Sequence, residues 1–168
     1  MKRLTEAIFL VLVTAAVAVA QPGGPSVEMA PAGVTPVVRG KPGTVELDFR
    51  VRQGFHINSN HPNSPYLIPT VLKVDALTDI AIGKVDYPTG RDLTFSFAPD
   101  EKLNVYSGDF ALKVTVHPLH TVLPGKYKVR GQLRYQACDD RACYPPRNLP
   151  VSFEVQVKKP ASGARHGR

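Results

Sequence analysis

The sequence has little cysteine, with only two such residues among 168, and no long apolar run after residue 20. Without such a run, we expect no transmembrane helix in the rest of the chain. No later segment shows a 3.6-residue apolar repeat with helix caps, which argues against a helical domain. Glycine-rich phosphate loops and Ser-His-Asp arrangements are also missing, so the corresponding nucleotide and hydrolase chemistries have no support.

Basic residues exceed acidic ones, but the excess is concentrated near the chain ends. The formal net charge is +7, and Lys158, Lys159, Arg165 and Arg168 all lie near the C-terminus. The body between the ends carries little net charge, so we expect no nucleic-acid binding. Residues 159–168 are predicted to be a disordered basic tail.

The N-terminal residues resemble an export signal. Lys2 and Arg3 precede an apolar stretch over 7–20, which closes on a small-x-small pattern before Gln21. These features predict a cleaved signal peptide over 1–20, with an uncleaved anchor as the rarer alternative. We therefore expect a soluble mature protein in the bacterial periplasm.

A proline-, glycine- and alanine-rich stretch over 21–34 is predicted to be a flexible linker. Beyond it, apolar and polar residues alternate strictly in several runs, the pattern of half-buried antiparallel strands. Turn residues separate these runs. Residues 35–158 therefore predict an all-β domain, an antiparallel β-sandwich of immunoglobulin-like type, with a small closed barrel as the competitor. The predicted strands are 44–51, 67–74, 80–86, 93–97, 109–116, 126–137 and 151–157.

The two cysteines, Cys138 and Cys143, lie only five positions apart. In an exported protein such a pair is most often a structural disulfide. However, a ring this short contributes only about 2 kcal/mol through loop closure. The intervening Asp139 and Asp140 predict an exposed hairpin tip, and their negative charge disfavours a thiolate. A pair that exchanges when a partner docks is therefore the competing interpretation.

The stretch YQACDDRACYPP (135–146) resembles the active-site strand pair of the periplasmic N-terminal domain of DsbD, the thiol:disulfide interchange protein. Two further stretches agree in order: QGFHINSNHPNSPYLIPTVLKV (53–74) and LNVYSGDFALKVTV (103–116). The resemblance covers about residues 35–157. It implies an immunoglobulin-like fold and a thiol–disulfide oxidoreductase that passes electrons to thioredoxin-fold periplasmic proteins, including those of cytochrome maturation.

The resemblance also implies residue roles. Cys143 would form the mixed disulfide with a partner, and Cys138 would resolve it. An aromatic cap would shield the pair, with Phe95 or Phe97 as the candidate. DsbD itself continues into membrane and thioredoxin-like parts, so we expect a separate membrane thiol-reductase as the electron source. No cofactor is implied, and we expect a monomer.

Other side chains are weaker candidates. Tyr144 and His56 are candidates to line the site. Tyr135 is a further candidate, although core or edge packing is the favoured role for it. Four histidines (His56, His61, His117 and His120) raise the alternative of a copper or zinc protein, but their spacing defines no ligand frame. The remaining alternative is a non-catalytic β-sandwich binding or assembly module with a structural disulfide.

Overall fold

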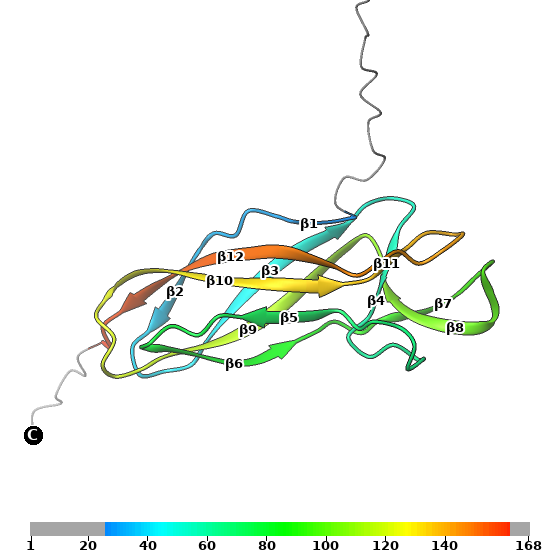
Figure 1. The fold of residues 1–168 in the computed structure, drawn as a ribbon. Helices are drawn as coiled ribbons and strands as arrows, with labels where there is room; N and C mark the ends of the chain where they lie inside the picture. Colours follow the sequence, from blue (N-terminus) through cyan, green and yellow to red (C-terminus); the bar gives the residue numbers. More distant parts are fainter. Residues whose placement is uncertain (1–25, 162–168) are drawn as a thin grey trace, which may run out of the picture.

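Twelve strands build the fold of residues 26–161, the part of the chain that the computed structural model describes (Figure 1). No helix occurs within that range, and so none there is long and apolar enough to cross a membrane. The all-β prediction is confirmed. The signal peptide, residues 21–25 of the predicted linker and residues 162–168 of the tail lie outside the described residues.

The first sheet has the order β1-β3-β9-β6 and is antiparallel throughout. Its long central pair alternates buried apolar with exposed polar side chains, because successive residues of a strand point to opposite faces. The strands are β1 (Val27–Met29), β3 (Gly43–Val51), β9 (Asp109–Pro118) and β6 (Ile80–Asp86).

The second sheet has the order β2-β12-β10-β5. Its strands are β2 (Val34–Val38), β12 (Arg147–Lys158), β10 (Gly125–Tyr135) and β5 (Val71–Val74). The edge strand β2 runs parallel to β12, which departs from the purely antiparallel sandwich that we predicted. Gly131 permits the close approach of β10 to β5, because a Cβ there would lie 2.4 Å from the Lys73 carbonyl oxygen.

The core lies between these two sheets and consists of their inward-facing side chains. Leu47 and Leu112 of the first sheet and Leu133 and Phe153 of the second are almost completely buried. Burial of such side chains is the main stabilising contribution to a sandwich of this size.

The predicted flexible linker over 21–34 is wrong in its second half. Residues Val27–Met29 form β1 on the first sheet, and Val27 is fully buried in the core. The linker was predicted from its high proline, glycine and alanine content. These residues surround a short segment that pairs with β3, and composition alone does not reveal that pairing.

The third sheet, with the order β11-β4-β8-β7, extends from one end of the sandwich (Figure 1). Its strands are β11 (Ala137–Cys138), β4 (His56–Asn58), β8 (Ala98–Tyr106) and β7 (Arg91–Phe95). Strand β11 follows β10 after a single residue, so the second sheet leads directly into the third. This arrangement places the first cysteine at the end of the domain, beside the β7–β8 hairpin.

Candidate functional site

Cys138 and Cys143 are joined by a disulfide across the tip of a small hairpin, with their sulfur atoms 2.03 Å apart. Two backbone hydrogen bonds close this hairpin beside the sulfurs. The Asp139 amide donates to the Ala142 carbonyl at 3.0 Å, and the Tyr144 amide donates to the Ala137 carbonyl at 2.8 Å. The predicted pairing and hairpin tip are therefore present in the structure.

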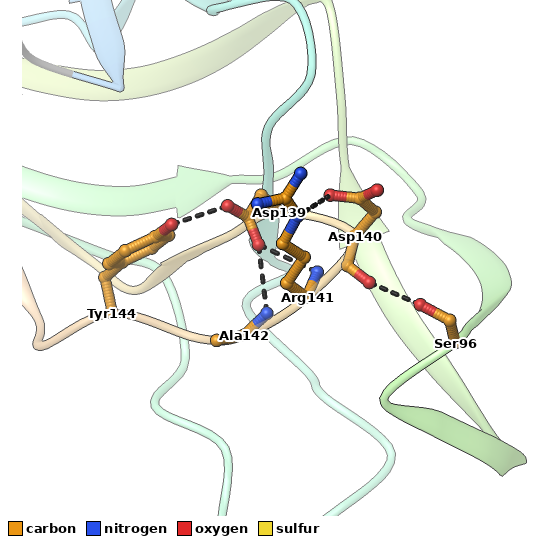
Figure 2. Close-up of polar contacts among 6 residues, drawn as sticks. All are labelled: Ser96, Asp139, Asp140, Arg141, Ala142 and Tyr144. Atoms are coloured by element: carbon orange, nitrogen blue, oxygen red, sulfur yellow. Dashed lines mark hydrogen bonds and ion pairs between the residues drawn. The ribbon is translucent and has the colours of Figure 1, made fainter. Parts of the chain in front are cut away.

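The carboxylate of Asp139 organises the loop between the cysteines, as Figure 2 shows. It accepts hydrogen bonds from the amides of Arg141 and Ala142 at 2.8 and 2.9 Å, and from the Tyr144 hydroxyl at 2.5 Å. These donors, the Tyr144 hydroxyl first, lower the pKa of Asp139 to about 2. Asp139 is thus a structural acceptor in this loop, whereas Asp140 is exposed beside Arg141.

The two sulfur-bearing residues differ in accessibility. Cys138 has an exposed fraction of 0%, whereas Cys143 is partly exposed. The difference follows from their positions, because Cys138 belongs to β11 within the third sheet and Cys143 lies beyond its edge. A protein that approaches the hairpin tip therefore meets Cys143 first.

His56 lies directly opposite Cys138, because β4 and β11 pair antiparallel in this register. Side chains at directly opposed positions share one face of a sheet, and their Cβ atoms are about 5 Å apart. The His56 side chain is buried, with an exposed fraction of 4%, and this burial lowers its pKa to about 4. The imidazole is therefore neutral at pH 7 and brings no positive charge to the cysteines.

The β7–β8 hairpin covers this face with aromatic rings. Phe95 stacks on His56 with ring centroids 3.8 Å apart, and Phe97 stacks on Phe95 at 5.6 Å. The hairpin also contacts the cysteine loop, because the Ser96 hydroxyl donates a hydrogen bond to the Asp140 carbonyl (Figure 2). Both predicted cap residues thus lie next to the residue that opposes Cys138.

The two tyrosines of the motif have different environments. Tyr135 is 2% exposed and belongs to the core, so it does not line the site. Tyr144 is 42% exposed, and its ring packs against Phe55 with centroids 6.0 Å apart. Its bond to Asp139 raises the pKa of the Tyr144 hydroxyl. Tyr144 therefore supports the segment that follows Cys143.

Gln136, which the sequence analysis did not single out, links three segments behind the site. Its carbonyl oxygen accepts hydrogen bonds from the Asn58 side chain at 3.0 Å and the Ile68 amide at 3.1 Å. Its amide group donates to the Tyr144 carbonyl at 3.2 Å. Gln136 immediately precedes β11, and its place in the stretch YQACDDRACYPP was its signal in the sequence.

The histidines do not assemble into a metal site within the described range. His56 lies under Phe95, whereas His61, His117 and His120 are exposed on other segments. Among residues 26–161, no three His, Cys, Asp or Glu side chains form a group that suits a metal ion.

The hairpin-tip disulfide, with one accessible and one buried cysteine, has the geometry that thiol–disulfide exchange needs. Residues 26–154 match the family described as "Thiol:disulfide interchange protein DsbD, N-terminal". The chain belongs to this family, and its general activity is therefore of the thiol–disulfide oxidoreductase type. A comparison with curated protein sequences gave no match.

Solved structures of three kinds are similar to the chain. One is the reduced N-terminal domain of DsbD from Neisseria meningitidis (18% identity, TM-score 0.44, 67% of this chain and 77% of that chain). Another is the seventh ScaB type I cohesin of Pseudobacteroides cellulosolvens (16% identity, TM-score 0.45, 82% of this chain and 96% of that chain). The third is a family 123 glycoside hydrolase of Clostridium perfringens (11% identity, TM-score 0.32, 74% of this chain and 23% of that chain). With TM-scores below 0.5, these similarities say nothing about function.

Proposed function

We propose that the dithiol form of this domain reduces disulfides of thioredoxin-fold proteins in the periplasm. The observation that carries the proposal is the unequal accessibility of the pair, with Cys138 buried and Cys143 partly exposed at a hairpin tip. Thiol–disulfide exchange needs one sulfur that the partner reaches and a second that resolves the mixed disulfide. Cys143 fits the first role and Cys138 the second.

The exchange proceeds in two displacements. The Cys143 thiolate attacks one sulfur of the partner's disulfide, forms a mixed disulfide and expels the other partner sulfur as a thiolate. The Cys138 thiolate then attacks the Cys143 sulfur, forms the intramolecular disulfide and releases the remaining partner sulfur. Two electrons pass to the partner, and the domain ends in the oxidised form described above.

A partner must displace the aromatic β7–β8 hairpin to reach both sulfurs. Phe95 and Phe97 form the cap in this proposal, supported by the Phe95–His56 stack and by the Ser96 hydrogen bond to the cysteine loop. The electron source that we propose is a membrane thiol-reductase, which returns the disulfide to the dithiol. The export signal predicted over 1–20 supports the periplasmic location.

Trapping the mixed disulfide tests the two cysteine roles. Cys138→Ala is expected to accumulate a mixed disulfide with an oxidised thioredoxin-fold protein through Cys143, because the variant lacks the thiol that completes the exchange. Cys143→Ala is expected to form no such adduct, since its remaining thiol is buried. Each single variant is incubated with oxidised periplasmic thioredoxin-fold proteins and separated on a non-reducing gel.

The matched control is the double variant, which should form no adduct. Equal adducts from both single variants would remove the assigned roles. No adduct from either variant would favour a binding module with a structural disulfide.

A further inference from the structure

We propose that His56 accepts the proton of the Cys138 thiol when this cysteine resolves a mixed disulfide. The inference rests on the proposed function and deepens it. The first observation is register, since His56 pairs with Cys138 across β4 and β11 and shares its face of the sheet. The other face carries Ile57 and Ala137, which pack in the core. The His56–Cys138 face is thus distinct from the sandwich interior and lies under Phe95.

The second observation is an unused acceptor or donor. The Nε2 atom of His56 is buried and has no hydrogen-bond partner in this oxidised structure. Buried polar atoms are nearly always paired, and a redox or catalytic role is one of the explanations for an exception. A disulfide sulfur carries no proton, whereas the thiol of reduced Cys138 is a donor on the same face. Reduction therefore adds a hydrogen-bond donor to the face of the sheet on which His56 lies.

The third observation is that the buried Cys138 thiol needs a base to become a thiolate. Cys138 is fully buried, and burial in apolar surroundings disfavours the thiolate that must attack Cys143. The acidic side chain closest to the pair in the chain, Asp139, is already engaged by three donors. The β7–β8 hairpin brings Phe95 and Phe97 over His56, and neither side chain titrates. Among these neighbours, His56 alone is a neutral base at pH 7.

The proton balance completes the resolving step. As the Cys138 sulfur attacks the Cys143 sulfur, its proton moves to His56 and the partner sulfur departs as a thiolate. The imidazolium then releases the proton to solvent, and His56 returns to the neutral form. No electrons pass through His56, and the overall exchange of two electrons is unchanged.

The test separates the two displacements with Ellman's reagent, an aromatic disulfide that releases one coloured thiolate in each step. Reduced full-length protein is mixed with the reagent in a stopped-flow instrument between pH 5 and 9. The first thiolate reports attack by Cys143, and the second reports resolution by Cys138. General base catalysis is typically worth about 100-fold or more, so His56→Gln is expected to slow the second phase by at least about 10-fold at pH 7. It should not slow the first phase, because loss of the Phe95–His56 stack can only ease access to Cys143.

The pH profile adds a readout that a structural role would not move. The rate of the second phase should rise with pH up to the thiol pKa in His56→Gln. In the natural protein, this rate should level off at a lower pH. Added imidazole should partly restore the second phase of His56→Ala, which retains space for it. The matched control is His117→Gln, an exposed histidine of β9 that pairs with β6.

The outcomes distinguish this inference from the proposed function. Equal second-phase rates in His56→Gln and the natural protein, or equal slowing of both phases, would overturn the role of His56 and leave thiol exchange intact. Release of only one coloured thiolate by the natural protein would overturn the proposed function itself, and the inference with it.

Discussion

At the scale of single residues, His56 makes the stability of the oxidised domain depend on pH. Burial lowers its folded pKa to about 4, below the 6.5 of an ordinary histidine. Between these values the unfolded chain binds a proton that the folded chain does not bind. The stabilisation is therefore complete above pH 6.5 and is lost as the pH falls towards 4. We expect urea midpoints at pH 7 and 4.5 to differ more for the natural protein than for His56→Gln, and parallel changes in both would contradict this assignment.

Tyr144→Phe tests the loop that joins the cysteines. The hydroxyl of Tyr144 is the largest cause of the low pKa of Asp139, which should rise from about 2 towards 3.8 in the variant. Stability linked to this carboxylate is present above its unfolded pKa and is lost as the pH falls through the folded one. Carboxyl NMR titration measures the shift directly. Tyr66→Phe, which alters an exposed tyrosine outside the site, is the control and should leave the Asp139 pKa unchanged.

At the scale of elements, the β7–β8 hairpin is the proposed cap of the disulfide. Phe95→Ala removes the ring that stacks on His56, an interaction worth about 0.5–1.5 kcal/mol. If the hairpin must open before reduction, dithiothreitol should reduce this variant about 2- to 10-fold faster than the natural protein. Thr94→Ala changes an exposed neighbour on the same strand and should leave the rate unchanged. Equal rates of reduction in Phe95→Ala and Thr94→Ala would show that the hairpin does not limit reduction of the disulfide.

The elements also show how far the sequence predicts this protein. Strict alternation predicted β3 and β9 closely, because one face of each strand packs in the core. Strand β8 was missed, because its first five residues are mostly exposed and carry no alternating apolar pattern. The cysteine pair was predicted from the chain, whereas the Gln136 hydrogen bonds were not. Those bonds join segments as far as 78 positions apart, and their register is set by tertiary structure.

At the scale of the whole molecule, the core and not the disulfide should hold the fold. Closing so short a ring contributes only about 2 kcal/mol. Leu112→Ala, a fully buried change in β9, should cost about 2–5 kcal/mol. Reduction of the natural protein should therefore lower the melting temperature no more than Leu112→Ala does. Circular dichroism melts with and without reductant measure both effects, and unfolding of the reduced protein at 25 °C would favour a structural disulfide.

The two backbone hydrogen bonds beside the cysteines have a consequence for recognition. They hold the hairpin from both sides of the sulfur pair without involving either sulfur atom. The oxidised and reduced molecules should therefore present nearly the same outline to any protein that docks on them. A docking partner would then distinguish the dithiol form from the disulfide form only at the hairpin tip itself. In the proposed function, disulfide molecules would therefore compete with dithiol molecules for one docking site. Once that site is saturated, the ratio of the two forms, rather than their total amount, would set the rate at which partners are reduced.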